Sequence, residues 1–145
     1  MKADPAPVPK ILVLASGSGT NLQALIDATR ERDFPGEIIA VGCNKPGAFA
    51  LERAAQANLT TFVVDHTKYG SREEFDAALL AEILRHNPDL VVLAGFMRIL
   101  TSDFVRAFRG RMLNIHPSLL PAYTGLNTHQ RVLEAGDRTH GVSIH

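Results

Sequence analysis

The sequence predicts an α/β protein with a doubly wound, mostly parallel sheet that has helices on both faces. Two observations support this prediction. Apolar runs of five or six residues alternate with segments of helical periodicity five times along the chain, which is typical of parallel strands joined by helices. In addition, the runs 11–15 and 90–94 are apolar throughout, as expected for strands that are buried on both faces of a sheet.

The first half of the chain contains two and a half such units. A strand at 10–15 precedes a helix at 21–32, because the apolar side chains of the latter recur on one face. A strand at 37–42 and a helix at 48–57 form the next unit. A third strand follows at 60–64, where β-branched and aromatic residues are concentrated.

The second half continues the alternation. Ser71 and Glu74 have the spacing of a capping box, which predicts a helix from 71 to 86, and Pro88 separates this helix from the next strand. The remaining strands are expected at 90–94, 111–115 and 141–145, and the remaining helices at 102–108 and 128–135.

Composition argues against several classes of protein. Fifteen Lys and Arg residues balance fifteen Asp and Glu residues, so a general electrostatic attraction to nucleic acid is not expected. The longest aliphatic run, Ile11–Ala15, is far shorter than the roughly 20 residues of a membrane-spanning helix. The single cysteine, Cys43, has no internal disulfide partner, which favours a reducing, cytoplasmic location.

We expect 1–9, with its three prolines, to be a disordered leader and 10–145 to be one domain.

A glycine-containing loop, Ser16-Gly-Ser-Gly-Thr-Asn21, joins the first strand to the first helix. Glycines at 17 and 19 allow a tight turn, and the amide groups and dipole at the helix start favour a phosphate. No lysine follows the glycines, as it would in a P-loop, and Leu22 occupies the third glycine position of a dinucleotide fingerprint. A monophosphate therefore fits this loop better than a dinucleotide; the alternative is a plain strand-to-helix turn.

The segment Leu113–Pro121 follows the fifth strand and is the second candidate site. Strand alternation puts Asn114 and His116 on one side, at the carboxyl edge of the sheet, where ligands bind in this fold class. An amide donor beside an imidazole suits acyl transfer, since the amide can stabilise an oxyanion and the imidazole can move a proton. The alternative is a histidine that only ends a strand. No metal site is expected. His116, His129, His140 and His145 are the candidate ligands, but no pair of them has the helical spacing of a zinc site and no cysteine cluster accompanies them.

Two further segments are ambiguous from the sequence alone. Gly95–Leu100 follows the fourth strand and surrounds Arg98 with apolar side chains, which suits a pocket for a flat ring or a junction that packs on the core. Cys43 ends an apolar strand, and such a thiol is more often buried and inert than nucleophilic.

Three blocks of the sequence, 16–23, 93–100 and 113–121, resemble the folate-dependent phosphoribosylglycinamide formyltransferases, and 125–129 and 140–145 extend the match. The resemblance implies transfer of a formyl group from 10-formyltetrahydrofolate, as co-substrate, to the amine of glycinamide ribonucleotide in de novo purine biosynthesis. It implies the following site residues: Gly19, Thr20 and Asn21 for the substrate phosphate; Arg72, Met97, Arg98, Ile99, Leu100 and Asn114 for folate; Asn114 and His116 for catalysis.

The resemblance also implies a truncation. In that family an aspartate follows the strand that here ends at His145, so we expect a C-terminally truncated domain that is inactive or nearly so. Thr124 is a smaller departure, since many relatives have proline there. A homodimer is possible within the family.

Three rival interpretations stay open. Methionyl-tRNA formyltransferase shares the block after the fifth strand, but the zero net charge argues against a tRNA-binding protein. Formyltetrahydrofolate deformylase uses similar catalytic groups with water, but it needs no ribonucleotide phosphate loop. The third is a catalytically inactive module that still binds the ribonucleotide phosphate.

Overall fold

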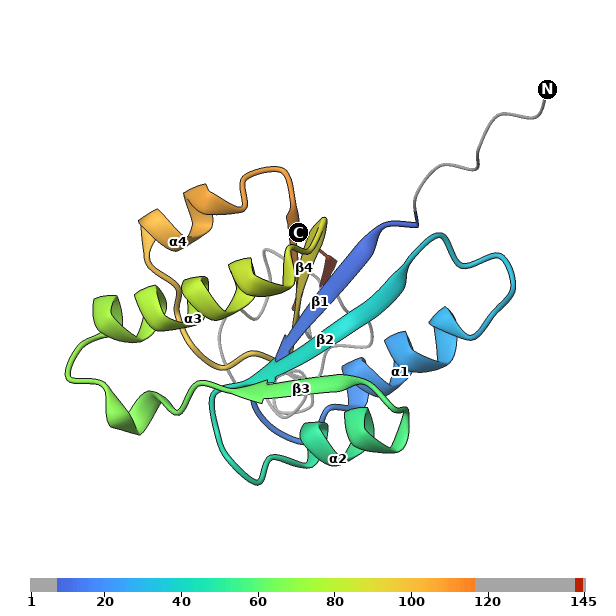
Figure 1. Cartoon of the computed structure of the whole chain (residues 1–145), viewed down its shortest axis with the longest axis horizontal. Helices are drawn as coiled ribbons and strands as arrows, with labels where there is room; N and C mark the ends of the chain where they lie inside the picture. The colour runs from blue at the N-terminus through green and yellow to red at the C-terminus, as the bar shows by residue number, and fades with distance from the viewer. Residues whose placement is uncertain (1–7, 117–142, 145) are drawn as a thin grey trace, which may run out of the picture.

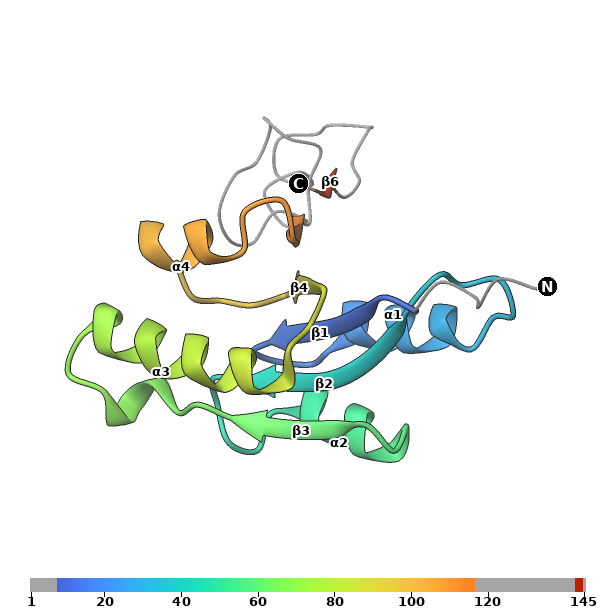
Figure 2. The same cartoon turned by 45° about the horizontal axis from the view of Figure 1, so that its top comes forward.

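The computed structural model describes residues 8–116 and 143–144, and within them six strands form one sheet in the order β3-β2-β1-β4-β5-β6 (Figures 1 and 2). The strands are β1 (Lys10–Ala15), β2 (Glu37–Cys43), β3 (Thr60–Val63), β4 (Leu90–Ala94), β5 (Met112–His116) and β6 (Ser143–Ile144). The helices are α1 (Thr20–Thr29), α2 (Phe49–Gln56), α3 (Arg72–His86) and α4 (Ser102–Ala107), with a 3₁₀ turn, η1, at His66–Lys68.

The order of the strands reverses at β1, the central strand. From β1 the chain passes outward to β2 and β3, and then returns to the other side of β1 with β4 and β5; all of these pairings are parallel. Among the described strands, β6 alone is antiparallel, opposite β5. The predicted doubly wound, mostly parallel sheet is therefore confirmed, and its switch point lies between β1 and β4, where ligands bind in such sheets.

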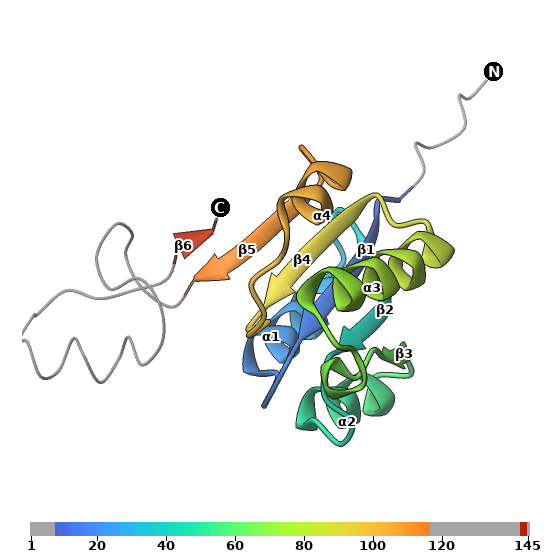
Figure 3. The same ribbon diagram turned by 90° about the vertical axis from the view of Figure 1, so that its left-hand side faces the viewer.

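Each face of the sheet has its own hydrophobic core, because successive side chains of β1 point to opposite faces. Ile11, Val13 and Ala15 pack with α1 and α2, whereas Leu12 and Leu14 pack with α3 and α4. Figure 1 shows α3 and α4 on one side of the strands and α1 and α2 on the other, and Figure 3 shows the arrowheads of β1, β4 and β5 pointing to the same edge.

The predicted boundaries of most elements differ from the observed ones by a residue or two, and α1 differs by more. It was expected to reach residue 32 but ends at Thr29, because the amides of Arg30 and Glu31 turn back to the carbonyls of Asp27 and Ala28 and tighten the last turn.

The predicted capping box of α3 is formed with one difference. Ser71 accepts a hydrogen bond from the Glu74 amide at 3.2 Å, as expected, but the Glu74 carboxylate accepts from the amide of Gly70 at 3.1 Å and not from that of Ser71. The expected helix at 128–135 and most of the leader fall outside the described residues, and the expected strand at 141–145 is described only at 143–144. Within the described ranges, no helix has the length and hydropathy needed to cross a membrane.

Candidate functional site

Two pockets lie at the carboxyl edge of the sheet, and the segment 93–98 lines both. The first, of about 280 Å³, is formed by the loop between β1 and α1 together with residues that follow β4. Its lining residues are Gly17, Ser18, Gly19, Thr20, Asn21, Ala94, Gly95 and Met97. The three residues predicted to hold a phosphate therefore share one pocket at the switch point.

Gly19 is the residue on which the shape of this loop depends. It is the N-cap of α1 with φ +74°, in the left-handed region, and a Cβ at this position would lie 2.8 Å from the Cα atom of Ala50 in α2. Because the N-cap is a glycine, no N-cap side chain occupies the free amides of the helix, and the first turn of α1 has no acidic residue. The start of the helix therefore suits an anion. Gly17 is different, because a Cβ there would meet no described atom within 4 Å.

Ser16 links the two halves of the first pocket, a role that the sequence did not reveal. The Ser16 side chain is buried, and its hydroxyl accepts a hydrogen bond from the Met97 amide at 2.7 Å. The Ser16 amide donates to the carbonyl of Gly95 at 3.2 Å. These two contacts fix the segment after β4 against the loop after β1. The only signal in the sequence was a polar residue at the end of an apolar run.

Replacing Ser16 with alanine should therefore lower the free energy of unfolding by about 1–3 kcal/mol, because the amide of Met97 loses its buried acceptor. Ser18→Ala is the matched control; its side chain is exposed, and a change within about 0.5 kcal/mol is expected. Denaturant unfolding of both variants measures the difference. Equal values for the two serines would contradict the anchoring role of Ser16.

The second pocket, of about 490 Å³, is mostly apolar and lies between the segment after β4, α4 and β5. It is lined by Leu93, Phe96, Arg98, Ile99, Leu100, Val105, Met112 and Asn114. Most residues predicted to bind folate are therefore brought together here, and Met97 lines the neighbouring first pocket. The side chain of Ile99 is 74% exposed, so apolar surface is available at this pocket.

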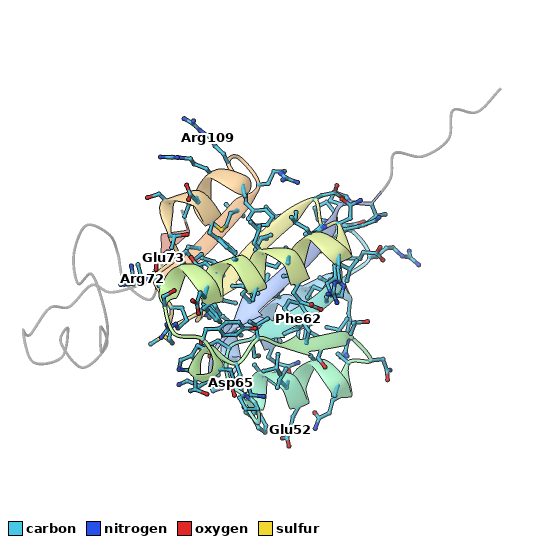
Figure 4. All side chains as sticks on the ribbon, turned by 60° about the vertical axis from the view of Figure 1, so that its left-hand side comes forward. Glu52, Phe62, Asp65, Arg72, Glu73 and Arg109 are labelled. Carbon is cyan, nitrogen blue, oxygen red and sulfur yellow. The ribbon has the colours of Figure 1, made fainter. Side chains whose placement is uncertain are left out.

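Arg72 is placed differently from the other predicted folate residues. It is the first residue of α3, is exposed, and lines neither pocket (Figure 4). The guanidinium carbon of Arg98, by contrast, lies 5.4 Å from the centre of the Phe75 ring, which holds this arginine against α3.

Asp76, a buried residue of α3, fixes the far end of the segment that lines both pockets. One oxygen of its carboxylate accepts a hydrogen bond from the amide of Thr101 at 2.6 Å. The hydroxyl of Thr101 in turn accepts from the amide of Phe104 and caps α4. The segment 93–98, which Ser16 holds at Met97, is thus anchored a second time by Asp76 through Thr101. The sequence contains no signal that singles out this acidic residue inside a helix.

Asn114 and His116 both lie on β5, two residues apart. Asn114 is aligned with Leu93 of β4 and lines the second pocket. The backbone of His116 ends β5 opposite Ser143 of β6. The predicted placement of both residues at the fifth strand, toward the carboxyl edge of the sheet, is therefore observed. His129, His140 and His145 lie outside the described residues. Among residues 8–116 and 143–144, no three His, Cys, Asp or Glu residues group together as metal ligands would.

Cys43, at the end of β2, is 1% exposed, as expected for an inert thiol. Burial raises its pKa from 9.0 to about 11, because the charged thiolate loses hydration. At about pH 8 its thiolate fraction is about 100-fold lower than that of an exposed thiol. We therefore expect a thiol reagent such as dithionitrobenzoate to react at least that much more slowly with the folded protein than with protein unfolded in guanidinium. Comparable rates in the two states would contradict the burial.

The chain is similar in sequence and in structure to known proteins. The family model described as formyl transferase matches residues 9–145. The chain is 53% identical over 135 residues to phosphoribosylglycinamide formyltransferase of Escherichia coli strain K12. This match covers 93% of this chain and 64% of that protein. It is 46% identical over 136 residues to the human trifunctional purine biosynthetic protein adenosine-3, covering 94% of this chain and 14% of that protein. The solved phosphoribosylglycinamide formyltransferase from Coxiella burnetii superimposes with a TM-score of 0.90 at 50% identity, over 96% of this chain and 65% of that one.

Proposed function

This chain belongs to the formyl transferase family, and from that premise we propose that its protein transfers the formyl group of 10-formyltetrahydrofolate to the amine of glycinamide ribonucleotide. One observation supports this most strongly. The pocket at the loop after β1, where the amides that begin α1 suit an anion, and the mostly apolar second pocket share the segment 93–98 at the end of β4. A transferase for a phosphorylated amine and a flat co-substrate needs these two sites side by side.

The first pocket fits the phosphate of the ribonucleotide. The amides of Gly19, Thr20 and Asn21 begin α1 without a capping side chain, so they can donate to phosphate oxygens. The lack of an acidic residue in the first turn leaves the dipole of the helix uncompensated.

The second pocket fits a flat ring system. Apolar side chains such as Leu93, Phe96 and Leu100 provide most of its lining, and Asn114 and Arg98 provide polar groups at defined points, which is the usual composition of a site for a small organic molecule. We assign this pocket to 10-formyltetrahydrofolate, which supplies the activated formyl group when it is bound. Arg72 would contact folate from outside this lining, since it lines neither pocket.

Asn114, which lines the second pocket, and His116, two residues further along β5, would carry out the chemistry. The amide of Asn114 would donate a hydrogen bond to the formyl oxygen as negative charge develops on it. His116 would assist the movement of a proton from the attacking amine to the folate nitrogen that leaves. No metal ion takes part in this scheme.

The chain spans 64% of the length of the Escherichia coli relative, so the activity should be tested with protein expressed from its complete coding sequence. We expect formylated glycinamide ribonucleotide to accumulate only when both substrates are present. Release of formate from 10-formyltetrahydrofolate without the ribonucleotide would indicate a deformylase instead. Binding of the ribonucleotide without either reaction would indicate an inactive binding module.

A further inference from the structure

Arg53, a half-buried residue of α2, contacts the phosphate loop, residues 16–21, from outside the first pocket. Its Nε donates a hydrogen bond to the carbonyl of Ser18 at 2.6 Å, and its Nη1 donates to Oε1 of Gln23 in α1 at 3.4 Å. The guanidinium carbon lies 4.7 Å from the centre of the Phe49 ring, which holds the side chain in place. Arg53 therefore joins α2 both to the loop and to the helix that the loop begins.

The hydrogen bond to Ser18 determines the direction of the next amide. In a trans peptide the carbonyl and the following N–H point in opposite directions. A Ser18 carbonyl that points toward Arg53 therefore turns the N–H of Gly19 away from α2. The pocket lies on that other side, because its remaining wall comes from residues that follow β4.

Arg53 also affects the electrostatics of the loop. A cationic donor on the Ser18 carbonyl polarises the peptide, which makes the Gly19 amide a stronger donor. The structure shows no ion pair between Arg53 and a carboxylate among the described residues. Its positive charge is therefore not compensated locally, and it adds to the positive end of α1.

We propose that Arg53 is a positioning residue for the substrate phosphate, which orients the Ser18–Gly19 peptide so that the Gly19 amide faces the anion. This inference rests on the proposed function. Arg53 itself does not line the pocket, so it acts through the loop and not by direct contact with the substrate.

The test compares the variants Arg53→Met and Arg53→Lys of the complete protein, with Arg30→Met as the matched control. Arg30 is exposed at the opposite end of α1, about 15 Å along the helix from the loop. For Arg53→Met we expect the KM for glycinamide ribonucleotide to rise about tenfold, since a charge-assisted hydrogen bond is lost. The inhibition constant of inorganic phosphate, as competitor of the ribonucleotide, should rise by the same factor. The KM for 10-formyltetrahydrofolate and kcat should stay within about threefold.

Lysine keeps the charge and a donor, so Arg53→Lys should recover at least half of the loss on a logarithmic scale, and Arg30→Met should resemble the unsubstituted protein. An unchanged ribonucleotide KM in Arg53→Met, an unchanged phosphate inhibition constant, equal losses for both substrates, or no recovery by lysine would each overturn the proposal. If the unsubstituted protein does not use the ribonucleotide at all, the proposed function fails, and this inference fails with it.

Discussion

Replacing His116 with alanine in the complete protein should lower kcat by about 10²–10⁴, because the reaction loses the group that moves its proton. Binding of glycinamide ribonucleotide should stay within about twofold, since the phosphate loop lies after β1 and His116 ends β5. Asn114→Ala should lower kcat by about 10²–10³, the usual loss when one donor to a developing oxyanion is removed. Steady-state kinetics together with calorimetric titration of the ribonucleotide separate these effects.

Leu113→Ala is the control for both substitutions. Leu113 lies beside Asn114 on β5, and strand alternation points it to the opposite side; its side chain is 39% exposed. Its replacement should leave kcat within about threefold. A His116→Ala enzyme with full activity, or a Leu113→Ala enzyme as impaired as Asn114→Ala, would show that the chemistry has been assigned to the wrong side of the strand.

The second large effect is expected at Gly19. Alanine at this position would have to adopt the left-handed conformation, which costs roughly 1–2 kcal/mol, and its Cβ would overlap the backbone of Ala50. The loop must therefore shift or the protein must lose stability, by at least about 2 kcal/mol in total. In either case the amides at the start of α1 move, so ribonucleotide affinity should fall more than tenfold.

Gly17→Ala is the matched comparison, since its Cβ would meet no described atom and its φ is not in the left-handed region. We expect this variant to unfold within about 0.5 kcal/mol of the unsubstituted protein. Denaturant unfolding and ribonucleotide titration measure both properties. Two glycines that behave alike would contradict the geometry described for the loop.

The sequence predicted the fold well for a physical reason. Parallel strands that are buried on both faces appear as continuous apolar runs, so β1 and β4 could be placed closely from the sequence. The end of α1 was predicted three residues too far along, because it depends on backbone hydrogen bonds that the pattern of apolar side chains does not reveal.

The candidate site could be predicted only in part. The phosphate loop could be predicted because its signal, glycines directly before the start of a helix, lies in consecutive residues. The residues that hold the site in place were not visible, because their hydrogen bonds join positions far apart in the chain. Ser16 and Met97 are 81 residues apart, Arg53 and Ser18 are 35 apart, and Asp76 and Thr101 are 25 apart. Such pairs become neighbours only when the sheet brings the strand ends together.

The most direct test of this account is a crystal structure of the complete protein with glycinamide ribonucleotide and a non-transferable analogue of 10-formyltetrahydrofolate. We predict the phosphate on the amides of Gly19, Thr20 and Asn21, and the ring of the analogue in the pocket lined by Leu93, Phe96 and Leu100. The glycinamide amine should lie beside Asn114. A phosphate bound anywhere other than the start of α1, or an analogue bound outside that pocket, would contradict the account.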